Sequence, residues 1–199
     1  WQNIPGRLTN VDVSDKDHVW GVNRNQQIYR RTKNTWQNIN GRAIQVGVGP
    51  SGVWVVNRDH NIYYRTGTFG DIDTAGSGWV QVPGKLKWVA SGNNIVVGVN
   101  AADEIFYREG ISSSNPTGSR WVKVSGRLMQ IDISDSHVIG TNSQHHIYRA
   151  PVEKKSDQLQ TAITATWSRI PGGLTKISKG DSGVWGVNRN EGIFKLNTD

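Results

Sequence analysis

The seven residues VWGVNRN occupy Val19–Asn25 and occur again, letter for letter, at Val184–Asn190. A near-copy, VWVVNRD, lies at Val53–Asp59. Identical segments near both ends of a chain indicate an internal repeat, and the length of that repeat restricts the choice of architecture. The extent and spacing of the repeat are therefore the first properties to establish.

The whole chain aligns on tryptophans, and repeats begin at Trp1, Trp36, Trp79, Trp121 and Trp167. Each repeat follows the frame W-x-x-[IV]-x-G and reaches an Asn that is followed, five residues on, by Ile and an aromatic residue. The starts are 35, 43, 42 and 46 residues apart, which is typical of four-stranded propeller blades. The runs between turn residues are short and β-branched, and helical periodicity is absent. The sequence predicts an all-β, five-bladed β-propeller with four antiparallel strands per blade, forming a single domain over residues 1–199.

The order of the runs predicts how the ring closes. The chain starts with a Trp strand and ends with Ile193–Lys195, so the last blade lacks an outer strand and Trp1–Ile4 is left over. We expect this N-terminal strand to complete the last blade, which would remove two exposed strand edges. The longer insertions, Thr66–Gly78, Glu109–Arg120 and Ala150–Thr166, are predicted to be loops.

Composition excludes several classes of function. The 199 residues contain no cysteine, which rules out disulfides and thiolate metal sites, and no apolar stretch is long enough for membrane insertion. The net charge of +7 favours anionic partners, but acidic residues are interleaved with the basic ones, so nucleic-acid binding is not expected. No nucleophile motif or phosphate-binding loop is present, so we expect no enzyme activity. The same groups recur in every blade instead, which suits several weak sites that act together.

The segments VWGVNRNQQIYRR, GVWGVNRNEGIFK and GISSSNPTGSRW, together with the W-x-x-[IV]-x-G frame, resemble the tectonin repeat. They are most similar to fish-egg lectins and to the lipopolysaccharide-binding, tachylectin-type lectins of horseshoe crabs. The resemblance covers all five repeats and implies a secreted, extracellular lectin of innate defence. It also implies partners that are glycans with N-acetylglucosamine-type sugars, bacterial lipopolysaccharide or other anionic surface glycans. Fish-egg lectins are typically cysteine-bearing, which this chain is not.

The turn that follows the repeated motif supplies the candidate carbohydrate-binding residues. An Asn amide offers both a donor and an acceptor to sugar hydroxyls, but Asn is also a natural turn residue, and its presence in all five repeats favours a structural role. The Arg that follows it in three repeats would then vary the ligand from blade to blade. The candidates are Asn23, Arg24, Asn57, Arg58, Asn188 and Arg189.

Tryptophans inside the motif complete the candidate sites. Trp20, Trp54 and Trp185 occur in three repeats and are replaced by Val97 and Ile139 in the others. The aliphatic replacements favour a packing role, whereas a Trp at the rim could stack on a sugar ring.

The sequence predicts no cofactor, and calcium is the one metal ion for which it offers candidate ligands. Two acidic loops offer Asp71 with Asp73 and Asp15 with Asp17 as oxygen ligands. Neither loop has a fuller ligand set, which favours plain solvated loops. The expected function is a multivalent lectin, the alternative is a propeller that serves as a protein-interaction scaffold, and the oligomeric state stays open.

Overall fold

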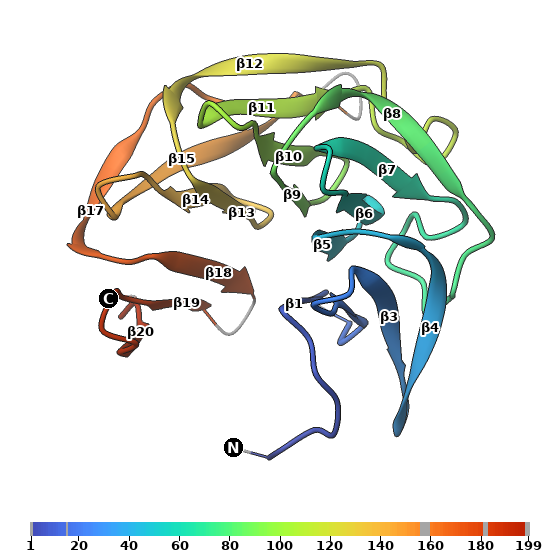
Figure 1. Cartoon of the computed structure of the whole chain (residues 1–199). Helices are drawn as coiled ribbons and strands as arrows, with labels where there is room; N and C mark the ends of the chain where they lie inside the picture. The colour runs from blue at the N-terminus through green and yellow to red at the C-terminus, as the bar shows by residue number, and fades with distance from the viewer. Residues whose placement is uncertain (1, 15, 156–159, 181–182, 198–199) are drawn as a thin grey trace.

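The computed structural model describes residues 2–14, 16–155, 160–180 and 183–197, and all regular elements within these ranges are β-strands. Five antiparallel sheets stand side by side around an axis, with the first strand of each blade innermost (Figure 1). The prediction of an all-β, five-bladed propeller is confirmed. Within the described ranges, no helix has the length and apolarity needed to cross a membrane.

Each blade takes its strands in chain order from the axis outward, except that in blade 4 both β16 and β17 pair with β15. Blade 1 contains β1 (Asn10–Val13), β2 (Val19–Val22), β3 (Gln27–Thr32) and β4 (Thr35–Arg42). Blade 2 contains β5 (Gln45–Gly49), β6 (Gly52–Val56), β7 (Asn61–Arg65) and β8 (Trp79–Lys85). Blade 3 contains β9 (Trp88–Ser91), β10 (Val96–Val99), β11 (Glu104–Glu109) and β12 (Arg120–Arg127). Blade 4 contains β13 (Gln130–Ile133), β14 (His137–Thr141), β15 (His146–Lys155), β16 (Gln160–Ile163) and β17 (Ser168–Gly173). Blade 5 contains β18 (Lys176–Gly180), β19 (Gly183–Val187) and β20 (Ile193–Lys195).

The repeated Ile and the [IV] of the frame form one buried cross-strand pair in each of the first four blades. These pairs are Ile28 with Ile39, Ile62 with Val82, Ile105 with Val124, and Ile147 with Ile170. All eight side chains are at most 8% exposed. Their burial explains why the sequence keeps branched aliphatic residues at both positions.

The Trp and Gly of the frame join neighbouring blades at the rim. In four repeats the indole Nε1 donates to a backbone carbonyl at 2.6–2.9 Å. Trp79, Trp121 and Trp167 bond Asn40, Pro83 and Ser125 of the preceding outer strand, and Trp36 bonds Pro5, which lies before β1. The ring lies on the Gly that follows this carbonyl; at Gly41, which has φ +109°, an added Cβ would lie 2.9 Å from Trp79 Nε1. Only glycine leaves room for the indole and adopts this φ readily. We call this contact the Trp–Gly clamp.

Near the axis, side chains of the first strands bond the backbone of the next blade. Gln45 bonds both the N–H and the carbonyl of Val89, and Gln130 bonds both groups of Ile177, at 2.6–2.9 Å. Between blades 1 and 2, Asn10 Oδ1 accepts from Val46 N at 3.0 Å. These hydrogen bonds join adjacent blades near the axis, and the side chains of Gln45 and Gln130 are buried.

The predicted closure of the ring is wrong for the described residues. Blade 5 has three strands, β20 pairs with β19, and residues 2–4 belong to no strand. Trp1 itself lies outside the described residues. Ile4 is 45% exposed and Ile193 is 61% exposed, although they are the pair that closure would bury. The ring is therefore open between blade 5 and blade 1, with β18–β20 on one side of the opening and β1 on the other (Figure 1).

One of the three predicted loops is partly a hairpin. The segment 150–166 continues β15 outward and returns as β16, with Val152 opposite Ile163. Ile163 is 7% exposed and packs into the cluster that joins blades 3 and 4. The tip, residues 156–159, lies outside the described residues. Thr66–Gly78 forms no strand, as expected. Of the predicted loop Glu109–Arg120, the two end residues pair with each other as the ends of β11 and β12, and the residues between them form no strand.

Candidate functional site

The five repeated Asn side chains hold the turns that follow them. In each turn the Asn Oδ1 accepts from the backbone N–H groups two and four residues later, at 2.8–3.0 Å, as shown by Asn23, Asn57, Asn100, Asn142 and Asn188. The third residue after each Asn has a positive φ of 63–64°. The Asn oxygens are thus scaffold in every blade, as favoured from sequence. The Nδ2 groups of Asn23 and Asn100 also donate within the protein, to Gln27 Oε1 and Glu104 Oε2.

This geometry predicts the effect of removing one turn amide. Asn142→Ala takes away the acceptor for Gln144 N and His146 N, so we expect the free energy of unfolding to fall by about 1–2 kcal/mol. Chemical denaturation measures the change. Gln144→Ala, in the same turn with an exposed side chain, is the matched control and should alter stability by less than about 0.5 kcal/mol. Equal losses in both variants would contradict the scaffold role.

The candidate arginines stand on the same turns. Arg24, Arg58 and Arg189 are all exposed. A guanidinium nitrogen of Arg189 lies 2.7 Å from His145 Nε2 of the preceding blade. The structure places these three groups on one face of the ring in blades 1, 2 and 5, and it does not bring them into one cluster.

Two of the three candidate tryptophans are corrected to core residues. Trp20 is 3% exposed and Trp54 is fully buried, because each ring packs between its own blade and the next. Neither ring can stack on a sugar. Trp185 is 39% exposed beside the opening, with Lys195 Nζ 5.4 Å from its ring centroid.

The calcium candidates have protein partners where they are described. Asp71 is buried and its Oδ1 lies 2.7 Å from His18 Nδ1, while Asp73 pairs with Arg30 at 3.2 Å. Asp15 lies outside the described residues, and Asp17 is exposed. Within the described ranges, no three His, Cys, Asp or Glu side chains converge in a way that could hold a metal ion.

A cleft of about 280 Å³ lies at the junction of blades 1 and 2, next to the Trp–Gly clamp. We call it the junction cleft, and its lining is Ile28, Gly41, Arg42, Val55, Asn57, Tyr63 and Trp79. The Trp79 indole is fixed by its bond to Asn40 O, and Arg42 Nη1 donates to Asn25 O at 2.7 Å. The cleft therefore combines an amide, a guanidinium, a phenol and an indole against an aliphatic floor, a set that suits a sugar ring with its hydroxyls and apolar faces.

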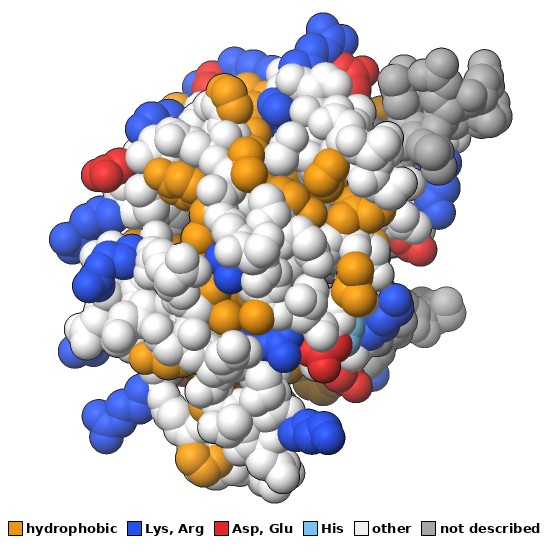
Figure 2. Space-filling view, turned by 90° about the vertical axis from the view of Figure 1, so that its right-hand side faces the viewer, with side chains coloured by type: hydrophobic (Ala, Val, Ile, Leu, Met, Phe, Trp, Pro, Cys, Tyr) orange, Lys and Arg blue, Asp and Glu red, His pale blue; other side chains and the backbone are white. Residues whose placement is uncertain are grey.

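The sequence identified Asn57 as a candidate but did not predict that Arg42, Tyr63 and Trp79 line the same cleft. Arg42 and Gly41 belong to blade 1, while Asn57, Tyr63 and Trp79 belong to blade 2. A signal was present: the repeated Gly-Arg or Gly-Lys step follows the repeated Trp, and the outer strand of one blade lies beside the Asn turn of the next. The surface around the rim is mixed, with Lys and Arg dispersed between small apolar patches (Figure 2).

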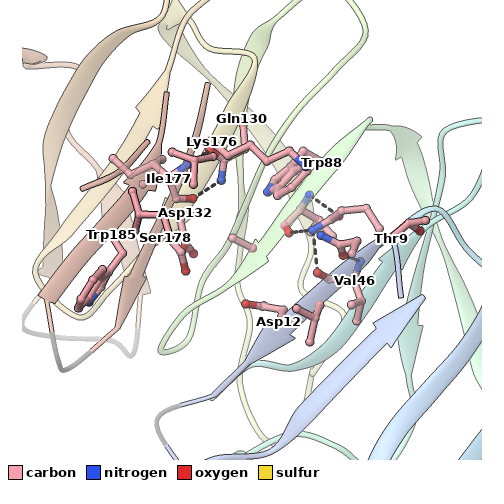
Figure 3. Close-up of a pocket in the computed structure, with 18 residues that line it drawn as sticks. Thr9, Asp12, Val46, Trp88, Gln130, Asp132, Lys176, Ile177, Ser178 and Trp185 are labelled. Atoms are coloured by element: carbon pink, nitrogen blue, oxygen red, sulfur yellow. Dashed lines mark hydrogen bonds between the residues drawn. The ribbon is translucent and has the colours of Figure 1, made fainter. Parts of the chain in front are cut away.

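A second cavity, of about 470 Å³, follows the axis and reaches the opening. Figure 3 shows Asp12 and Asp132 on opposite sides of it, with Trp88 and Gln130 farther along its wall. Burial raises the pKa of Asp12 to about 8, and repulsion by Asp132 adds to this effect. Burial also raises the pKa of Asp132 to about 6, against a hydrogen bond from Lys179 N that lowers it. The two carboxyl groups oppose each other's ionisation across the axis.

Comparison with known proteins supports the repeat assignment. A family model described as "Tectonin domain" matches residues 1–127 and 119–199. The Perivitellin-2 31 kDa subunit of Pomacea maculata is 41% identical over 54 residues, which is 27% of this chain and 19% of that relative. The matched region therefore spans about a fifth of the relative's length.

Solved structures show the same type of fold at low identity. Prp20p from Saccharomyces cerevisiae matches with a TM-score of 0.63 at 8% identity, over 92% of this chain and 56% of that one. YCF48 from Cyanidioschyzon merolae matches with a TM-score of 0.58 at 16% identity, over 100% of this chain and 71% of that one. At such identities the likeness is one of fold alone.

Proposed function

This chain belongs to the tectonin domain family, and from that premise we propose that it is a multivalent lectin. Its ligands would be glycans that carry N-acetylglucosamine-type sugars, including bacterial lipopolysaccharide, bound outside the cell as part of innate defence. The observation that carries this proposal is the junction cleft, in which Asn57, Arg42 and two aromatic rings meet.

The elements of the cleft recur at two further junctions, which supports more than one binding site of the same general design. Between blades 2 and 3 the corresponding residues are Lys85, Asn100, Phe106 and Trp121, and between blades 3 and 4 they are Arg127, Asn142, Tyr148 and Trp167. The clamp bond that fixes the indole is present at both junctions. Single sugar contacts gain little over water, so repeated sites would supply the affinity by avidity.

Differences between the junctions predict that the sites are unequal. The Asn100 Nδ2 donates to Glu104 Oε2 at 2.8 Å, whereas the lining of the junction cleft contains no carboxylate. Tyr63 supplies a hydroxyl where Phe106 has none. We therefore expect the cleft between blades 1 and 2 to bind more tightly than that between blades 2 and 3.

A glycan array, run with and without a calcium chelator, tests the proposal. Titration calorimetry with N-acetylglucosamine then counts the sites. The double variant Arg42→Ala/Tyr63→Phe removes two hydrogen-bonding groups, so we expect the affinity of one site to fall about tenfold or more and the stoichiometry of the tight phase to drop by one. Lys33→Ala, at an exposed turn between β3 and β4, is the control. Absence of binding to every glycan, at millimolar sugar, would reject the lectin function.

The candidate arginines are tested separately, with an anionic ligand. The triple variant Arg24→Ala/Arg58→Ala/Arg189→Ala should weaken binding to lipopolysaccharide several-fold at low salt and change binding to neutral N-acetylglucosamine little, because charge attraction at exposed groups is screened by salt. Surface plasmon resonance at two ionic strengths measures this. An unchanged response to lipopolysaccharide would remove these residues from the site.

A protein-interaction propeller is the second candidate, and the apolar walls of the opening favour it. Val11 and Val13 on blade 1 are 56% and 51% exposed, and exposed apolar surface of this kind marks contact sites. The solved structure of Prp20p is described together with its binding to Gsp1p and histones. The glycan array distinguishes the two functions, because a lectin must bind glycans and a protein-interaction scaffold need not.

A further inference from the structure

The outer-strand residue opposite the repeated aromatic side chain differs from blade to blade. Its cross-strand pairs are Tyr63 with Gln81, Phe106 with Lys123, and Tyr148 with Arg169. Tyr63 lines the junction cleft, and cross-strand partners lie on the same face of a sheet. We call the position held by Gln81, Lys123 and Arg169 the facing position, because it lies on the side of its blade that faces the preceding blade.

At the junction of blades 2 and 3, the facing position reaches the repeated Asn. Lys123 Nζ donates to Glu104 Oε1 at 2.6 Å, and Glu104 Oε2 accepts from Asn100 Nδ2 at 2.8 Å. Glu104 is the fourth residue after the Asn, and in blade 1 the fourth residue, Gln27, likewise accepts from Asn23 Nδ2 at 2.9 Å. The facing residue, the fourth residue after the Asn and the Asn amide therefore act on the same space.

At the junction of blades 3 and 4, these three positions carry Arg169, His146 and Asn142, and none of them is acidic. Within the described ranges, the side chains of Arg169 and His146 have no hydrogen-bond or ion-pair partner, and Asn142 Nδ2 has no acceptor. Asn142 Oδ1 is occupied by its turn. Three sets of donors are thus available on one face of blade 4.

Blade 3 contributes a second guanidinium to the same junction. Arg127 Nη1 donates to Ala102 O at 2.9 Å, just as Arg42, which lines the junction cleft, donates to Asn25 O. This bond leaves the other guanidinium nitrogens of Arg127 for a ligand. The aromatic wall is also in place, because an added Cβ at Gly126 would lie 3.1 Å from Trp167 Nε1.

The other two junctions do not offer this combination of charges. The lining of the junction cleft contains a single cation, Arg42. Between blades 2 and 3, Lys85 Nζ donates to Asp59 O and Asn61 Oδ1, and Lys123 pairs with Glu104. Hydrogen bonds from Lys123 and Asn100 hold the pKa of Glu104 below its usual value, and the charge of Arg127 adds a little to this effect. Of these three junctions, that of blades 3 and 4 is the one with two guanidiniums and no carboxylate at the corresponding positions.

We propose that the junction of blades 3 and 4 selects a sugar that carries a phosphate group, an inference that rests on the proposed lectin function. A phosphate monoester has up to about two negative charges and three acceptor oxygens, and guanidinium groups bind it through paired N–H···O bonds. His146 and Asn142 supply further donors, and the aromatic rings pack against the sugar. We call this group the phosphate-sugar set: Arg127, Asn142, His146, Tyr148, Trp167 and Arg169.

A pair of ligands that differ only in the phosphate tests the proposal. In titration calorimetry at low salt, N-acetylglucosamine 6-phosphate should bind one site about tenfold or more tightly than N-acetylglucosamine. The difference should shrink at high salt, because exposed charges are screened. Inorganic phosphate lacks the ring and glucuronic acid carries a single charge, so both should bind more weakly than the sugar phosphate.

Exchanging residues between repeats locates the site. Arg169→Gln copies the residue of blade 2 and should reduce the preference for the phosphorylated sugar to less than about threefold, with binding of the neutral sugar unchanged. Arg149→Gln is the control, because Arg149 is exposed, pairs with Ser168 and lies on the opposite face of the same blade. The reciprocal variant Gln81→Arg should give the junction cleft a several-fold preference for the phosphorylated sugar.

The outcomes separate this proposal from the lectin function itself. Binding of N-acetylglucosamine without any preference for its 6-phosphate would overturn the proposal and leave the lectin function standing, whereas binding of neither sugar would reject both. Equal affinity for glucuronic acid would assign the junction to carboxylated sugars, and equal affinity for inorganic phosphate would make it an anion site that ignores the sugar. Equal losses in Arg169→Gln and Arg149→Gln would trace the preference to net charge and overturn the assignment to the phosphate-sugar set.

Discussion

Replacing Gly98 with valine is expected to lower the free energy of unfolding by about 3 kcal/mol. Gly98 lies on β10 opposite Val89, and a Cβ there would be 2.5 Å from Leu86 Cδ1 and 2.7 Å from the carbonyl oxygen of Trp88. Leu86 is buried and cannot move aside without disturbing the junction of blades 2 and 3. Chemical denaturation of the single variant measures the loss.

The chain itself contains the compensating pair that provides the control. Blades 1, 3, 4 and 5 combine a Gly on the second strand with a Leu that would touch its Cβ within 2.4–2.7 Å, whereas blade 2 has Val55 and Ala43 at these positions. In blade 2 both side chains are buried. Leu86→Ala alone removes a buried side chain and should cost about 2–4 kcal/mol.

The double variant Leu86→Ala/Gly98→Val copies the arrangement of blade 2. We expect it to lose at least about 1.5 kcal/mol less than the sum of the two single variants, because the Val methyl groups fill the space that the Leu vacates. Additive losses would show that Leu86 and Gly98 do not compete for the same volume. The cycle would then reject the size exchange as the reason for the different pair in blade 2.

Repeats made the fold predictable, because a pattern that holds in five copies averages out local exceptions. The buried pairs such as Ile28 with Ile39, and the clamps such as Trp79 on Gly41, follow directly from the conserved frame of the repeat. The turn role of Asn23 and its equivalents was also favoured from sequence, since a residue required by every turn is required by geometry.

Sequence could not decide features that depend on the angle between blades. Ring closure requires that five junctions together turn through a full circle, and contacts across a junction, such as the bonds of Gln45 with Val89, join residues far apart in the sequence. Whether Trp20 and Trp54 reach the surface depends on how closely the next blade approaches them. The junction cleft was missed for the same reason, because Arg42 and Tyr63 meet only across two blades.

The second large effect concerns the acidic pair on the axis and should be visible in the pH dependence of stability. The pKa of Asp12 is raised from 3.8 to about 8 and that of Asp132 to about 6. Each folded carboxyl group therefore holds its proton more tightly than the unfolded chain does, so the native state binds more protons between pH 4 and 8. The free energy of unfolding should be highest below the unfolded pKa and should fall as the pH rises through the folded values.

Asp12→Asn removes the charge that burial and Asp132 both oppose, while the Asn Oδ1 can still accept from Val48 N, which lies 2.7 Å from Asp12 Oδ2. At pH 9 we expect the variant to be more stable than the parent by about 2 kcal/mol, well below the full value of the pKa shift, because the side chain is only partly buried. Below pH 4 the two proteins should be nearly equal, since the parent carboxyl group is then neutral. Asp59→Asn, an exposed carboxyl group outside the axis, should shift stability by less than about 0.5 kcal/mol at either pH. A variant at Asp12 that is less stable than the parent at pH 9 would mean that the carboxylate is stabilised in place, by a partner on the axis that outweighs both desolvation and the charge of Asp132.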